Sequence, residues 1–162
     1  MHGQEASEAI SLGNVYTSAG GVVLKRLFKK SFYSDLLEAK QTAIEAICFL
    51  RKSFPLMNED QAADLRLVFN ELLMNAVVHG NRLDSLKKVN IEIEVEGGLI
   101  YSRVTDEGTG FDYHKMLTEW NAEDNLFDDH GRGVLLAYHM TDKFKFSEKG
   151  NVIEFYKRLV EE

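Results

Sequence analysis

Glu71 and Asn75 are the two side chains whose types and spacing most clearly indicate chemistry. They lie four residues apart in the apolar run 67–78, so on a helix they project from one stripe, which His79 continues one turn further on. A carboxylate buried without a partner is costly, and these groups should therefore face a cavity or be paired. The plainer alternative is that they are satisfied core or capping groups near a helix end.

A second cluster is the run Asp106-Glu-Gly108-Thr-Gly110, at the end of an expected strand. Asp106 shares a strand face with Val104, so its carboxylate lies at the mouth of a core face. There it could accept hydrogen bonds from a ligand's amino group, and Gly108 and Gly110 would let the backbone turn closely around that ligand. Taken alone, the same pattern also describes an ordinary turn.

A third cluster, Gly131-Arg132-Gly133, leads into an expected helix. Free amides at a helix N-terminus form an anion site, and glycines allow phosphate oxygens to approach them. Arg132 could add a positive charge. Taken alone, the same run also describes an ordinary helix entrance.

The elements that must position these clusters follow from hydrophobic periodicity. Helices are predicted over residues 35–52, 59–79, 113–120 and 134–140. Strands are predicted over 22–32, 89–95, 99–106, 143–147 and 152–159. Residues 1–21 are expected to be a flexible leader and 22–162 a single domain. Hairpins separated by helices favour an α+β two-layer sandwich, with a mixed, largely antiparallel sheet and helices on one face.

Composition excludes several classes of protein. The net charge of −7, from 19 basic and 26 acidic residues, argues against a protein that coats nucleic acid or anionic lipid. The single cysteine, Cys48, excludes a disulfide framework and is expected to be a small buried side chain. No apolar run approaches the roughly 20 residues of a membrane span, and no signal peptide is visible. We therefore expect a cytoplasmic protein with no direct nucleic-acid or membrane partner.

The order of the three clusters along residues 24–159 resembles that of the Bergerat-fold ATPases, a group that includes gyrase B subunits, chaperones, sensor histidine kinases and anti-sigma factor kinases. The run from Glu71 through Asn75 to His79-Gly80 looks most like the anti-sigma factor serine/threonine kinases. Sensor histidine kinases usually carry a second Asn where this chain has Glu71. They also need a phosphoacceptor His followed by Arg-Thr-Pro, which this sequence lacks.

This resemblance implies a role for most of the matched residues; His79 and Gly80 match the motif without an assigned role, and helix termination is enough to explain Gly80. Asn75 would ligate a Mg²⁺ ion that bridges the phosphates of ATP. Glu71 would be the general base that takes a proton from a serine hydroxyl or from water. Asp106 would bind the adenine amino group. Gly108 and Gly110 would shape the floor of the pocket. Gly131, Arg132 and Gly133 would lie in the ATP lid.

By the same resemblance, the chain would be a serine/threonine protein kinase that phosphorylates an anti-sigma antagonist and binds a sigma factor, with ATP and Mg²⁺ as cofactors and a homodimer as a possible assembly. An ATP-hydrolysing or ATP-gated switch, in which Glu71 activates water, is the alternative. A non-enzymatic binding module is disfavoured because Glu71, Asn75 and Asp106 are all present. Residues 119–130 hold five acids and no Lys or Arg, so most of the negative charge is local and does not argue against a nucleotide ligand.

Overall fold

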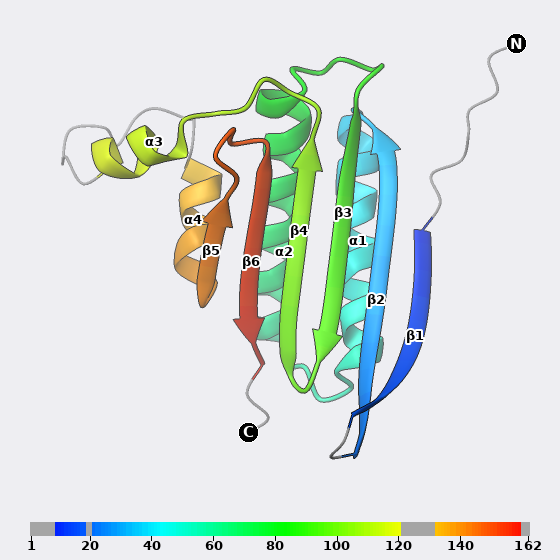
Figure 1. The fold of residues 1–162 in the computed structure, drawn as a ribbon. Coiled ribbons are helices and arrows are strands. Elements are labelled where there is room, and N and C mark those ends of the chain that lie inside the picture. The colour runs from blue at the N-terminus through cyan, green and yellow to red at the C-terminus, as the bar shows by residue number, and fades with distance from the viewer. Residues whose placement is uncertain (1–8, 19–20, 121–131, 160–162) are drawn as a thin grey trace, which may run out of the picture.

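Six strands form one sheet in the order β1-β2-β3-β4-β6-β5, in a computed structural model that describes residues 9–18, 21–120 and 132–159 (Figure 1). Each of the five described strand pairs is antiparallel, so the expected fold is confirmed and the described sheet contains no parallel pair. The strands are β1 (Ala9–Ser18), β2 (Gly21–Tyr33), β3 (Lys88–Glu96), β4 (Leu99–Asp106), β5 (Lys143–Phe146) and β6 (Val152–Arg158).

Strand β1 differs from the flexible leader expected over residues 1–21. It pairs with β2 along its whole length, from Ala9 opposite Lys30 to Ser18 opposite Gly21. Its sequence lacks charges and has no clear alternation of apolar and polar residues, so the pattern does not predict a strand. The strand forms because pairing with β2 supplies its backbone hydrogen bonds. Residues 1–8 and 19–20 lie outside the described part of the chain.

Helices α1 (Leu36–Ser53), α2 (Glu59–Asn75) and α4 (Arg132–Met140) cover one face of the sheet, and α3 (Tyr113–Trp120) lies beyond the β5 edge (Figure 1). The starts of the two long helices match the sequence prediction. The Asp35 side chain accepts hydrogen bonds from the first turn of α1, and Asn58 and Gln61 form a reciprocal capping box on α2. The capping box fixes where α2, the helix that carries Glu71 and Asn75, begins.

The end of α2 differs from the continuous helix to His79 that the sequence predicts, because the α-helix stops at Asn75. A π-helical turn, η1 (Ala76–Gly80), follows and closes with a hydrogen bond of 2.8 Å from Asn81 N to Ala76 O. Such wide turns occur mostly as single turns and often at functional sites. The changed winding leaves His79 exposed while Glu71 and Asn75 are half-buried, so the stripe of three polar residues is reduced to two.

The core lies between the sheet and the helix layer. Phe69 of α2 packs on Phe155 of β6, with ring centroids 5.5 Å apart, and Phe28 of β2 packs on Phe49 of α1 at 5.6 Å. Cys48, expected to be buried, is exposed because the buried face of α1 is set by Ala39, Ala43, Ala46, Phe49 and Leu50. The expectation of a buried cysteine is therefore wrong.

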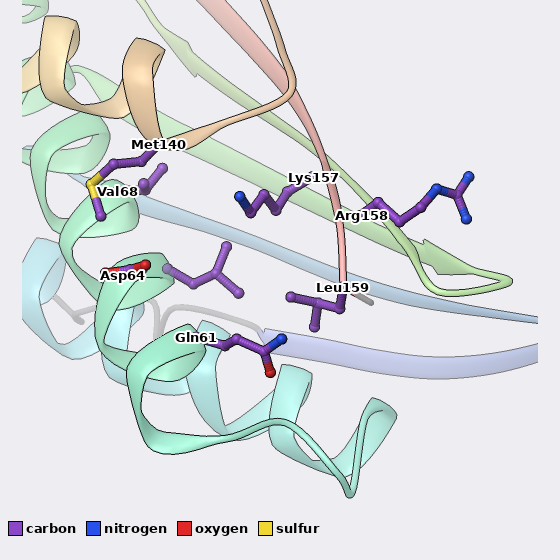
Figure 2. Close-up of a pocket in the computed structure, with 8 residues that line it drawn as sticks. Gln61, Asp64, Val68, Met140, Lys157, Arg158 and Leu159 are labelled. Carbon is purple, nitrogen blue, oxygen red and sulfur yellow. The ribbon is translucent and has the colours of Figure 1, made fainter. Parts of the chain in front are cut away.

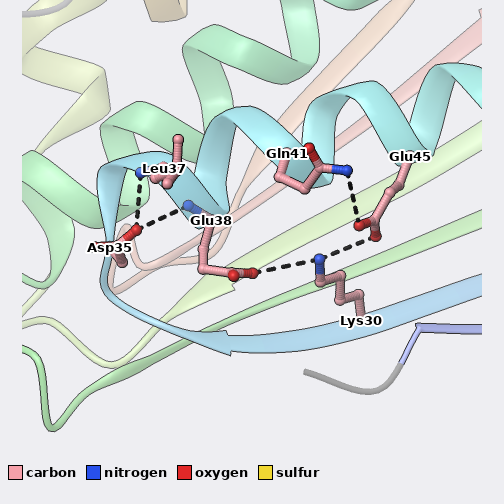
Figure 3. Close-up of polar contacts among 6 residues, drawn as sticks. All are labelled: Lys30, Asp35, Leu37, Glu38, Gln41 and Glu45. Atoms are coloured by element: carbon pink, nitrogen blue, oxygen red, sulfur yellow. Dashed lines mark hydrogen bonds and ion pairs between the residues drawn. The ribbon is translucent and has the colours of Figure 1, made fainter. Parts of the chain in front are cut away.

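Lys30 is a buried cation on the helix-facing side of β2 (Figure 3). Its Nζ lies 3.0 Å from Glu45 Oε2 and 3.5 Å from Glu38 Oε2, and both carboxylates belong to α1. A buried ammonium group must be paired to be tolerated. This cluster therefore ties α1 to the sheet by charge as well as by apolar packing.

Candidate active site

Asp106 ends β4 as a buried carboxylate, 6% exposed. Its Oδ1 accepts a hydrogen bond of 2.8 Å from Gly108 N, so the glycine loop turns around the carboxylate. Burial raises the pKa of Asp106, and the Gly108 hydrogen bond and the positive charges of Lys149 and Lys87 oppose that rise. The sequence prediction that Asp106 stands at the mouth of a core face agrees with this geometry.

Two glycines leave the room that Asp106 occupies. A Cβ atom on Gly80 would overlap the Asp106 carboxylate, and one on Gly108 would overlap the carbonyl oxygen of Gly80. The turn after α2 and the loop after β4 are therefore in direct backbone contact. Helix termination alone is enough to explain Gly80 in the sequence. The structure adds a second reason, because only a residue without a side chain allows Asp106 to approach so closely.

The floor of the loop is set by the turn between β5 and β6. Gly110, at φ +90°, lies against the carbonyl of Lys149, and Gly150, at φ +81°, lies against the backbone of Phe111. Asn151 holds the neighbouring strand end, because its Nδ2 donates to Asp106 O and its carbonyl accepts from Asp106 N, both at 3.0 Å. Gly150 and Asn151 are site-forming residues that the sequence motifs do not include.

Asn81 is a third residue that the motifs miss. It is fully buried, and its Nδ2 donates to Ser34 Oγ at 2.7 Å and to Lys88 O at 2.9 Å, while its Oδ1 accepts from Glu107 N at 2.8 Å. These bonds join the end of β2, the start of β3 and the residue after Asp106. Its one signal in the sequence is an Asn directly after the expected helix stop at Gly80.

Asn75 reaches across to α3. Its Nδ2 donates a hydrogen bond of 3.0 Å to the hydroxyl of Tyr113, which is 4% exposed and stacks on Phe146 with ring centroids 4.6 Å apart. Burial raises the pKa of Tyr113 to about 12, and the charge of Asp106 adds to the rise. Tyr113 therefore contacts the predicted site residue Asn75, and no motif in the sequence marks it.

Glu71 lies one turn before Asn75 and meets the start of α4. A Cβ atom on Gly133, in the first turn of that helix, would overlap the Glu71 carboxylate. The predicted base and the predicted lid glycine are thus in contact, and Gly133 is needed for that approach. Arg132 is exposed at the same helix start, and Gly131 lies outside the described residues.

The described residues of the three predicted clusters lie at the end of α2, the end of β4 and the start of α4. A family comparison decides the class. The model of the histidine kinase-like ATPase domain matches residues 37–157. The chain belongs to this family. No curated protein matches the chain.

Membership in the histidine kinase-like ATPase family supports ATP binding and suggests an ATP-using activity. The matched range holds all the predicted site residues, from Glu71 to Gly133. The α+β fold is consistent with this family, and the matched residues run from α1 through most of β6. Within the described ranges, no helix is long and apolar enough to cross a membrane.

A magnesium ion would have to depend on Asn75 in this domain. The described residues contain no group of three or more His, Cys, Asp or Glu side chains that could hold a metal. The amide nitrogen of Asn75 is engaged by Tyr113, while no hydrogen bond within the described part of the chain uses its Oδ1. One amide oxygen supplemented by phosphate oxygens and water suits Mg²⁺, so the residues fit that ion.

A pocket of about 400 Å³ lies elsewhere, at the start of α2, the end of α4 and the end of β6 (Figure 2). Its walls include Gln61, Asp64, Met140 and Lys157. None of the predicted site residues lines it. Asn75 lies at the end of α2, whereas the pocket lies at the start of that helix, and Asp106 ends β4, which contributes no residue to the pocket. This hollow is therefore separate from the candidate nucleotide site.

Proposed function

We propose that this ATPase domain is a serine/threonine protein kinase of the anti-sigma factor type. It would transfer the γ-phosphoryl group of ATP to a serine on an anti-sigma antagonist and would also bind a sigma factor, as a homodimer. The observation that carries the proposal is the position of Glu71, a carboxylate one turn from Asn75 and in contact with the start of α4 at Gly133. A general base is needed where a hydroxyl attacks phosphorus.

The reaction assigns a task to each residue. Asp106 accepts hydrogen bonds from the adenine amino group and so orients the nucleotide. Asn75 would hold Mg²⁺ through its Oδ1, and the ion, when bound, neutralises charge on the phosphates. The serine oxygen attacks the γ-phosphorus, the bond from that phosphorus to the β–γ bridging oxygen breaks, and ADP leaves. Glu71 receives the hydroxyl proton, so the products are phosphoserine, ADP and a protonated carboxyl group.

The start of α4 supports the same reaction. Its first-turn amides are not all satisfied within the helix, and they lie where Gly133 meets Glu71. A helix N-terminus favours negative charge, so this end of α4 suits the transferred phosphoryl group. The glycine keeps the helix close enough for base and phosphate to share one site.

Radiolabelled ATP distinguishes the kinase from the alternative switch. The protein is incubated with γ-labelled ATP, Mg²⁺ and a candidate antagonist protein that carries a serine. Label on the partner's serine supports the kinase, whereas free phosphate without labelled protein indicates that Glu71 activates water. Absence of binding to both ATP and ADP would contradict the proposal altogether.

The variant Glu71→Gln tests the base directly. It keeps the size and hydrogen-bonding capacity of the side chain but cannot take a proton, so transfer should fall by about 100-fold or more while Mg²⁺-ATP still binds in calorimetry. Glu96→Gln is the matched control, because Glu96 is exposed at the far end of β3. Retained transfer in Glu71→Gln would remove Glu71 from the role of base.

A further inference from the structure

Tyr113 contacts Asn75 although 38 residues separate them in the chain. We propose that Tyr113 is a positioning residue that holds the Asn75 amide with its nitrogen engaged, which leaves the carbonyl oxygen for a cation. The inference rests on the proposed role of Asn75 as a magnesium ligand. It adds to that role a residue from α3, outside the sequence motifs that point to the nucleotide site.

The orientation of the amide matters because its two ends differ chemically. The nitrogen only donates hydrogen bonds, whereas the oxygen can ligate a hard cation. A half-turn about the last side-chain bond exchanges them. The structure has the orientation in which Nδ2 donates to the Tyr113 hydroxyl at 3.0 Å, and no other hydrogen bond of the Asn75 side chain exists within the described residues.

Tyr113 can hold the amide because its own ring is fixed. The ring is 4% exposed and stacks on Phe146 of β5 with an interplanar angle of 10°. Phe111 packs against its edge, with centroids 5.1 Å apart, and its carbonyl accepts the Tyr113 backbone N–H at 3.0 Å. Two aromatic neighbours and a backbone bond leave the hydroxyl little freedom to follow a moving amide.

The variant Tyr113→Phe removes the hydroxyl and keeps both aromatic contacts. In nucleotide-free protein, the Asn75 side-chain amide signal in a proton–nitrogen correlation spectrum should shift; Asn75→Ala identifies it by its disappearance. In calorimetry, ATP affinity in EDTA should stay unchanged. The gain in ATP affinity on adding Mg²⁺ should shrink about fivefold, the effect of one ordinary hydrogen bond.

Tyr101→Phe is the matched control. It also removes a phenol hydroxyl, one that donates to Glu154 Oε1 at 2.5 Å between β4 and β6. This variant should leave both the Asn75 signal and the magnesium effect unchanged. Thermal unfolding of both variants shows whether either change merely loosens the fold.

A double-mutant cycle then tests whether Tyr113 acts through Asn75. In an Asn75→Ala background, Tyr113→Phe should cause no further loss of the magnesium effect. A further loss, or an unshifted Asn75 signal in the single variant, overturns the inference. If the wild-type protein binds ATP equally with and without Mg²⁺, the proposed magnesium role fails instead, and the Asn75 signal alone decides whether Tyr113 holds the amide.

Discussion

Gly80 lies so close to the carboxylate of Asp106 that a Cβ atom at position 80 would overlap it. Gly80 closes the π-helical turn after α2, and Asp106 ends β4, so this contact joins the helix layer to the sheet at the candidate nucleotide site. The same helix carries Glu71 and Asn75. The position of the proposed adenine-binding carboxylate relative to Glu71 and Asn75 therefore depends on the absence of one side chain.

Gly80→Ala should move Asp106 and weaken ATP binding. We expect a loss of about tenfold in affinity by calorimetry, together with destabilisation of about 1–3 kcal/mol in denaturant titration, because an inserted methyl group forces neighbours apart. Gly97→Ala is the control: at Gly97, φ +53°, a Cβ atom would meet no other atom within 4 Å. That variant should lose about 1 kcal/mol of stability through backbone strain and keep its ATP affinity.

Asp106→Asn should weaken ATP binding by about 10- to 100-fold, since a hydrogen bond to a charged acceptor becomes a neutral one. The amide oxygen can still accept the bond from Gly108 N, so the loop should keep its shape. Equal ATP binding by the variant and the wild type would contradict the adenine role.

The same substitution should change the pH dependence of stability. Burial raises the pKa of Asp106, so the folded protein binds this proton more tightly than the unfolded chain does. Its contribution to stability is thus complete below the unfolded pKa, about 3.9, and is lost as pH rises through the higher folded value. Asp106→Asn does not titrate, and its stability relative to wild type should increase with pH across that window in denaturant titrations.

Asn81→Ala should be among the more damaging polar substitutions in this domain. It leaves the partners of one buried and two part-buried hydrogen bonds without that bond, so we expect a loss of about 3 kcal/mol in the free energy of unfolding. Asn90→Ala, on the exposed side of β3, is the matched control and should change stability by less than about 0.5 kcal/mol. Similar unfolding midpoints for the two variants would show that the Asn81 bonds matter little.

The predictions that held depend on short-range patterns. The spacing of Glu71 and Asn75 follows from the helical repeat, and the place of Asp106 at a strand end follows from alternation and a two-glycine hairpin. The helix starts at Asp35 and Asn58 are readable because a cap and its partners lie within three residues. In each case, the information that fixes the structure is local.

What the sequence determined by itself was therefore the order of the elements from β2 onward and the chemistry that they carry. Tertiary structure alone decided the bond between Asn75 and Tyr113, the brace that Asn151 provides for Asp106, and the contact of Gly133 with Glu71. It also decided that His79 leaves the polar stripe and that Cys48 is exposed. The reason is physical. The three contacts join residues far apart in the chain, and the exposure of His79 and Cys48 depends on the winding and orientation of their helices. Both depend on how the helices pack on the sheet rather than on neighbouring residues.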